Sequence, residues 1–267
     1  MMNNTTSTDP SLPWAGGAYS IKRHGVTISN CDSEPVQTPG CIQAHGAMLV
    51  VQPGDFTVLQ VSENVGAHFG RTPEELLGQP VATVLGEEGA RRLREVLDRE
   101  PVERNPLYVF TLPAREAAPA LDLTAHLVDG VAVIECEPTA RAEAEPDYCA
   151  LVKQSVGRMQ SAQTLGEFCQ IAAEQVRALS GLDRVMAYRF HEDFHGEVVA
   201  ESKREDLSPW LGLHYPAEDI PRPAREIVTK IWVRPLPDAA EPVMALVPLV
   251  NPATQRPLNM THCAALR

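Results

Sequence analysis

Residues 183–190 have the sequence Asp183-Arg184-Val185-Met186-Ala187-Tyr188-Arg189-Phe190, a run of large and β-branched side chains that predicts a strand. A second strand is expected over 196–201, after a turn at 191–195. Successive side chains of a strand point to opposite faces, so Tyr188 is expected on the same face as Met186. This position alone favours a packed tyrosine whose hydroxyl group is hydrogen-bonded.

The turn has the sequence His191-Glu192-Asp193-Phe194-His195, which matches the H-E-x-x-H pattern of zinc proteases. That chemistry needs the two histidines one helical turn apart, so that both face one metal ion. Here the pattern follows a predicted strand and continues directly into Gly196, without helical periodicity. We therefore expect a polar hairpin tip, with two imidazoles that do not share a face and no metal site.

Residues 211–225 form an unusual loop that contains Pro216, Pro221 and Pro223. Prolines stiffen the backbone and remove the donors that a strand or helix needs. A rigid loop of this kind can hold Asp219 still for a polar ligand. The alternative is a proline-rich entry to the next helix, with Asp219 as its cap, and the spacing leaves both interpretations open.

The segments around this loop predict a GAF-type module. Residues 148–180 are expected to be helical, in two pieces broken near 164–166, and Gly181 fits a helix end. Another helix is expected over 223–233 and a strand over 242–247. A helix, two strands, a long loop, a helix and a strand is the order in which a GAF module begins.

The amino-terminal half predicts a PAS-like sensor module, with two strands, short helices and then three strands. Turn signals separate the strands at Pro53-Gly54-Asp55 and at Asp129-Gly130. A Thr72 cap followed by Pro73 opens a short helix. The expected strands are 47–52, 56–62, 107–112, 121–128 and 131–136, and a longer helix is expected over 87–99.

These elements predict an α+β fold of two modules, each an antiparallel sheet with flanking helices. The expected division is an arm over 1–45, a PAS domain over 46–138, a linker over 139–147 and a GAF domain over 148–267. The linker is assigned from its small, charged and proline residues. The last GAF strands are expected to be missing from this chain.

Composition narrows the class of protein. A chain of 267 residues is long enough for two domains, and a net charge of −12 argues against binding to nucleic acid or to an anionic membrane. No run approaches the roughly 20 apolar residues of a membrane span, and the amino terminus lacks a secretory signal. We therefore expect a cytoplasmic protein whose six cysteines are mostly free thiols.

Three segments together resemble the bacteriophytochromes, light receptors that carry the pigment biliverdin. They are Asn30-Cys31-Asp-Ser-Glu-Pro-Val-Gln-Thr-Pro-Gly-Cys-Ile-Gln-Ala-His-Gly46, Asp183-Arg-Val-Met-Ala-Tyr-Arg-Phe190 and Tyr215-Pro-Ala-Glu-Asp-Ile-Pro221. Their order and spacing make the resemblance specific, and it extends from about Ser29 to Arg267 as PAS followed by an incomplete GAF.

The resemblance implies that Cys31 forms a thioether with a vinyl group of biliverdin. A thiol on a polar arm is not a core residue, and its soft sulfur nucleophile suits one addition to a docked pigment. In the family this arm also threads a GAF loop to make a figure-of-eight knot. By position, Ile42 would be the threaded residue.

The resemblance also implies a set of pigment contacts. Asp219 would interact with the pyrrole N–H groups, and Ile220 would pack against the pigment. Tyr188 and Tyr215 would line the space around its D-ring. The cofactor-binding residues expected in this way are Cys31, Tyr188, Tyr215, Asp219, Ile220, Arg234 and Arg267, with the two arginines pairing the propionates.

The function expected from the resemblance is a red/far-red photoreceptor module. Light would isomerise biliverdin, and the module would signal to a PHY domain and histidine kinase that this chain lacks. We expect a homodimer in the full receptor, a response-regulator partner downstream and no enzymatic activity in this chain. The alternative is a pigment-free PAS–GAF remnant that binds a protein or a small ligand.

Overall fold

The computed structural model describes residues 36–100, 105–114, 118–139, 147–220 and 222–265. Their contacts group them into two units. Unit 1 draws on Met1–Ala140 and Arg222–Arg267, and unit 2 on Arg141–Pro221. Cys31 and Arg267, two of the expected pigment-binding residues, lie outside the described residues.

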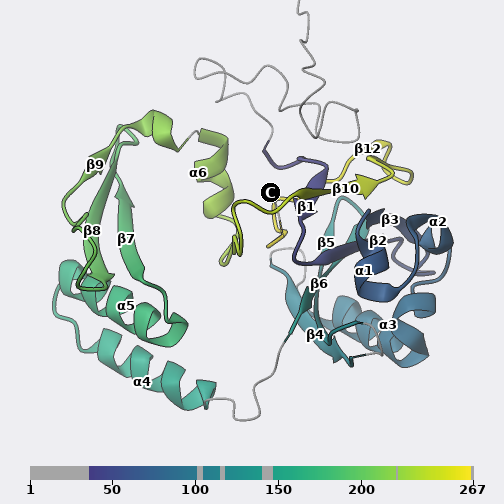
Figure 1. The fold of residues 1–267 in the computed structure, drawn as a ribbon, viewed down its shortest axis with the longest axis horizontal. Helices are drawn as coiled ribbons and strands as arrows, with labels where there is room; N and C mark the ends of the chain where they lie inside the picture. Colours follow the sequence, from purple (N-terminus) through teal and green to yellow (C-terminus); the bar gives the residue numbers. More distant parts are fainter. Residues whose placement is uncertain (1–35, 101–104, 115–117, 140–146, 221, 266–267) are drawn as a thin grey trace, which may run out of the picture. The chain divides into compact units, whose positions relative to one another are not determined.

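Unit 1 is built on a seven-stranded sheet in the order β1-β10-β3-β2-β6-β5-β4, with every neighbouring pair antiparallel (Figure 1). The predicted hairpin at Asp129-Gly130 is confirmed, because both residues have the positive φ of its turn, 48° and 80°. The strands are β1 Cys41–Gln43, β2 Ala47–Val51, β3 Val58–Ser62, β4 Leu107–Leu112, β5 Leu121–Val128, β6 Val131–Pro138 and β10 Val243–Val247. A small hairpin, β11 Val250–Asn251 and β12 Arg256–Pro257, follows β10.

One face of this sheet packs against three helices. They are α1 Val65–Phe69, α2 Pro73–Leu76 and α3 Ala82–Arg99. The expected cap of α2 is present: the Thr72 hydroxyl oxygen accepts a hydrogen bond from the Glu75 backbone, and the Glu75 carboxylate accepts one from the Thr72 backbone. The core on this side joins Leu76 and Leu93 of the helices to Leu49 and Ile134 of the sheet.

The other face of the same sheet is covered by the end of the chain. Met48 and Val133 of the central strands pack with Ile227 of α6 (Arg222–Val228) and with Met260 beyond β12. Because both faces are covered, β2 is buried at all five positions and its sequence is continuously apolar.

The expected strand at 242–247 is present as β10, but it is not part of a second-module sheet. It lies between β1 and β3, pairing Met244 with Ile42 and Val247 with Val61. The residues after 221 therefore pack with unit 1, whereas the sequence assigned all of 148–267 to the second domain. The domain boundaries themselves stay a prediction.

Residues at several separate positions of this terminal segment form hydrogen bonds with the amino-terminal arm. Gln43 donates to Pro235 O through its side chain (2.7 Å) and to Ala265 O through its backbone (3.1 Å). Met260 donates to Gln37 O at 2.7 Å. Ile42, between these bonds, is fully buried. A threaded arm would make such contacts, and the knot itself stays a prediction.

Unit 2 contains two helices and a three-stranded antiparallel sheet in the order β7-β8-β9 (Figure 1). Its helices, α4 Tyr148–Gln160 and α5 Leu165–Ser180, confirm the expected break, and Gly181 ends α5 with φ 69°. Helix α5 packs against β7 and β8, and α4 packs against α5. The remaining elements are β7 Arg184–Phe190, β8 Gly196–Lys203, β9 His214–Tyr215 and the short 3₁₀ helix η2 Ala217–Asp219.

The helix expected over 223–233 ends early, at Val228. Two backbone amides, those of Lys230 and Ile231, both donate to the carbonyl of Ile227. The hydroxyl of Thr229 donates to Glu226 O at 2.8 Å. These bonds satisfy carbonyl groups in the last turn of the helix.

A buried carboxyl group joins the end of the chain to the sheet of unit 1. Glu135 on β6 is 2% exposed and accepts a hydrogen bond of 2.7 Å from the Ala265 backbone. Burial raises the pKa of Glu135 to about 7. Burial also lowers the pKa of the neighbouring strand residue His126 to about 3, so that imidazole is neutral at physiological pH.

This carboxyl group makes stability depend on pH. Its pKa is 4.5 in an unfolded chain and about 7 in the folded one, so the folded state binds more protons between these values. The free energy of unfolding should therefore fall by up to about 3 kcal/mol as pH rises through this window. In Glu135→Gln the loss should be largely absent, as measured by urea unfolding at about pH 5 and about pH 8. Glu74→Gln, at an exposed acid of α2, is the control. An unchanged pH dependence in Glu135→Gln would contradict the assignment.

Candidate functional site

Strand register in unit 2 gathers three aromatic side chains on one face of its sheet. Gly196 of β8 pairs with Phe190 of β7 on one side and with Tyr215 of β9 on the other. Tyr188 pairs with Val198, next to a bulge after Ala187. Paired residues share a face, so Tyr188, Phe190 and Tyr215 come together around Gly196.

The rings make direct contacts. Tyr188 meets Phe190 edge to face, with ring centroids 5.2 Å apart and an interplanar angle of 78°. It also lies 6.0 Å from Tyr215, tilted by 43°. Such geometries are favourable for aromatic pairs. All three residues are half-buried, so one side of the cluster remains accessible.

Gly196 is required by this packing. A Cβ atom at position 196 would lie 1.7 Å from the Tyr188 hydroxyl oxygen and 1.8 Å from the ring carbon that bears it. Any side chain there must displace the ring. Gly196 and Phe190 were not among the site residues predicted from the sequence, although a glycine at the start of a strand is a signal for close approach by another group.

Asp219 comes four residues after Tyr215 in the sequence, at the end of the short helix η2. Pro216 is extended, with φ −62° and ψ 156°, and Asp219 is the last residue of η2, where its backbone donates to Pro216 O at 3.2 Å. Burial, followed by the negative charge of Asp219, raises the pKa of Tyr188. The carboxylate of Asp219 therefore acts electrostatically on the ring cluster, although the residue is exposed.

The structure thus brings together three of the predicted pigment contacts, Tyr188, Tyr215 and Asp219. Ile220 follows Asp219 directly and is half-buried, in an extended conformation (φ −127°, ψ 91°). Arg234 is an exposed residue of unit 1 beyond α6, and its role at the site stays a prediction.

The turn at 191–195 is present, but one expectation about it is wrong. The imidazoles of His191 and His195 do share a face: they stack with centroids 4.2 Å apart and planes at 5°. The reason is the hairpin register. These two residues continue the Phe190–Gly196 pair across the strands, and the His191 backbone donates to His195 O at 3.0 Å.

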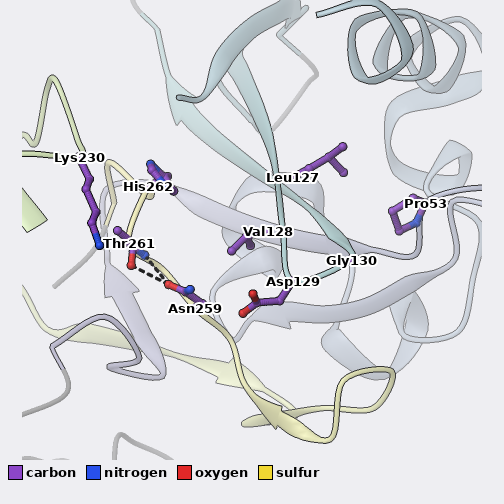
Figure 2. Close-up of a pocket in the computed structure, with 9 residues that line it drawn as sticks. All are labelled: Pro53, Leu127, Val128, Asp129, Gly130, Lys230, Asn259, Thr261 and His262. Carbon is purple, nitrogen blue, oxygen red and sulfur yellow. Dashed lines mark hydrogen bonds between the residues drawn. The ribbon is translucent and has the colours of Figure 1, made fainter. Parts of the chain in front are cut away.

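Unit 1 has a pocket of about 670 Å³ of its own, beside the β5–β6 turn (Figure 2). Lys230 and Asp129 both contribute to its lining, and Asn259 accepts hydrogen bonds from the backbone and hydroxyl of Thr261. Of the predicted pigment contacts that the structure describes, none lines this pocket. The lining residues are Pro53, Leu127, Val128, Asp129, Gly130, Lys230, Asn259, Thr261 and His262.

No helix in the described residues combines the length and the apolar character needed to cross a membrane.

Known proteins similar to this chain were found by sequence and by structure. Residues 31–139 match a family model described as a PAS fold. Cyanobacterial phytochrome B of Nostoc is 38% identical over 89% of this chain and 32% of its own length. The first curated relatives are all much longer, so the chain spans about a third of their length.

Two solved structures are similar over most of the chain. A bacteriophytochrome from R. palustris has a TM-score of 0.81 and 31% identity, covering 90% of this chain and 48% of that one. The chromophore-binding domain of Stigmatella aurantiaca phytochrome P1 has a TM-score of 0.77 and 33% identity, covering 89% of this chain and 78% of that one. Together with the PAS-fold match, these similarities show that the chain belongs to the phytochrome family.

Proposed function

We propose that this chain is the pigment-carrying sensory part of a red/far-red photoreceptor, with biliverdin attached to Cys31. The observation that carries the proposal is the aromatic face of unit 2. There the Tyr188 ring covers Gly196 and lies 6.0 Å from the Tyr215 ring, and the negative charge of Asp219 contributes to raising the pKa of Tyr188. The solved relative from Stigmatella is itself a chromophore-binding domain, which supports the same conclusion.

The residues present fit a linear tetrapyrrole. Its flat conjugated rings can pack against Tyr188, Phe190 and Tyr215, because aromatic faces favour offset or edge contacts. Its pyrrole N–H groups need an anionic or polar acceptor, and the carboxylate of Asp219 is available for that role. Arg234 and Arg267 would pair with the propionates, since a guanidinium group matches a carboxylate in geometry.

Burial argues against one of the two cysteines of the arm. Cys41 is fully buried in β1, opposite Ala245, and cannot reach a ligand without opening that strand pair. Cys31 lies outside the described residues, six positions before Gln37, the first described arm residue that is anchored by a hydrogen bond. Because Cys41 is enclosed, and because the resemblance implies attachment at Cys31, we assign attachment to Cys31.

When bound, the pigment would supply visible-light absorption and a double bond that light isomerises. The protein would bind the pigment and respond to its isomerisation. Asp219 accepts hydrogen bonds, Tyr188 and Tyr215 confine one end of the ligand, and Cys31 keeps it in place. Signalling to a downstream histidine kinase, and a homodimer in the full receptor, belong to the same proposal.

Covalent attachment is the first test. After incubation with biliverdin and denaturation, intact-mass spectrometry should show wild type and Cys41→Ser each heavier by one pigment molecule. Cys31→Ser should show no covalent adduct, because the nucleophile is absent. An adduct on Cys31→Ser, or none on wild type, would rule out the proposed attachment.

Gly196→Ala tests the packing that forms the site. The added methyl group must displace the Tyr188 ring, so pigment affinity should fall at least about tenfold, with about 1–3 kcal/mol lost in stability. Biliverdin titration and urea unfolding measure the two effects. Gly157→Ala is the matched control, because a Cβ there meets only open space on α4. Equal pigment binding by Gly196→Ala and wild type would show that the ring position is unimportant.

Asp219→Ala separates attachment from light response. The variant should still form the covalent adduct, because the thiol is untouched, while its light-induced absorbance change should become smaller. Glu218→Ala, the neighbouring exposed acid, is the control and should photoconvert as wild type does. The role assigned to Asp219 fails if its variant photoconverts normally under red illumination.

One observation favours the alternative, a pigment-free interaction module. Helices α4 and α5 bury only Ser155 and Ala173, and they leave several large apolar side chains exposed. Such a surface suits contact with another protein, which the homodimer would also provide. The exposed residues are Tyr148, Val152, Val156, Leu165, Phe168, Val176 and Leu179. Failure of wild type to bind biliverdin would favour this alternative.

A further inference from the structure

A cluster of histidines lies on the side of β8 that faces away from Tyr188. His195 and Glu197 flank Gly196, so their side chains point opposite to the position that the Tyr188 ring covers. His191 lies across from His195 in the hairpin, and His214 of β9 pairs directly with Glu197. Three strand ends thus present three imidazoles to one place.

The ring positions suit a shared ligand. His191 stacks on His195, and the His214 ring lies 5.2 Å from His195 and 6.1 Å from His191. One ligand atom from each of the three histidines lies within 4.8 Å of the others. Imidazole nitrogens on one tetrahedral zinc ion are about 3.4 Å apart, given zinc–nitrogen bonds of about 2.0–2.1 Å. Small side-chain rotations of half-buried and exposed residues close this difference.

Two carboxylates orient the rings. Glu197 accepts a hydrogen bond of 2.8 Å from Nε2 of His191, and Asp193 accepts one from Nδ1 of His195. Each bond fixes the proton on one ring nitrogen and leaves the lone pair on the other, as in the carboxylate–histidine pairs of metal sites.

We propose that His191, His195 and His214 bind one divalent transition-metal ion, with Zn²⁺ as the probe that represents the class. Neutral imidazoles are ligands for zinc, copper and nickel, whereas magnesium and calcium prefer oxygen. Glu197 lies 4.0 Å from Nε2 of His214 as well, so it supplies anionic charge between two of the ligands. This site is separate from the proposed pigment site and uses none of its residues.

A metal ion here would tie β9 to the β7–β8 hairpin. Strand β9 has only two residues, and its register with β8 depends on few backbone bonds. One of them joins Val198 N to Leu213 O at 3.0 Å, and a neighbouring bond joins Gly212 N to Val198 O at 2.9 Å. A metal ion held by His214 and the hairpin would therefore restrain the backbone from which Tyr215 projects.

Isothermal titration of the pigment-free full chain with ZnCl₂ at about pH 7.5 tests the proposal. We expect one zinc ion per chain, at least a tenfold loss of affinity in His214→Gln and in His191→Gln, and no measurable Mg²⁺ binding. Zinc should also slow amide hydrogen exchange at Val198 and Gly212 in wild type. Unchanged zinc affinity in the two histidine variants overturns the proposal.

Two control variants exclude other zinc ligands. His45→Gln changes a histidine of unit 1, and Cys149→Ser removes an exposed thiol on α4. Both should bind zinc as wild type does. A comparable loss of affinity in either control would place the ion elsewhere and would also overturn the proposal. Circular dichroism of each variant checks that it is folded.

Discussion

The contact between the Tyr188 ring and Gly196 is the constraint on which the functional site depends. Only a residue without a side chain lets the ring lie across β8, because a Cβ would meet the hydroxyl at 1.7 Å. From that position the ring reaches Phe190 on its own strand and Tyr215 two strands away. The same contact places the ring within the influence of the Asp219 charge. The absence of a side chain at Gly196 thus determines how the three aromatic rings are arranged.

The position of the amino-terminal arm depends on a different feature of the fold. Strand β10 lies in the sheet of unit 1 and pairs with β1 of the arm. Residues 37–43 hydrogen-bond to carbonyl and amide groups at Pro235, Met260 and Ala265. The described part of the arm is therefore held to unit 1 by hydrogen bonds at three separate points of the terminal segment.

Sequence reasoning succeeded where local physics decides the outcome. The Asp129-Gly130 turn, the Thr72 cap and the Gly181 helix end each follow from the conformational preferences of one or two residues. The resemblance indicated Tyr188 and Tyr215, and the register of unit 2 brings these two rings 6.0 Å apart. Their role as pigment contacts stays a prediction.

What the sequence did not reveal depends on pairing between distant segments. The partners of β10 are β1 and β3, about 200 and 180 residues earlier, and no local pattern specifies them. The stacking of His191 on His195 follows from hairpin register, which the H-E-x-x-H spacing does not encode. The need for Gly196 became clear only when a residue eight positions away was seen to cover it.

The light-minus-dark absorption difference spectrum of the wild-type chain with biliverdin tests the central claim most directly. The proposal predicts a red-region band that red light converts and far-red light restores, because in it the aromatic face would confine the pigment and Asp219 would respond to its isomerisation. A spectrum identical to that of free biliverdin, unchanged by illumination, would contradict it.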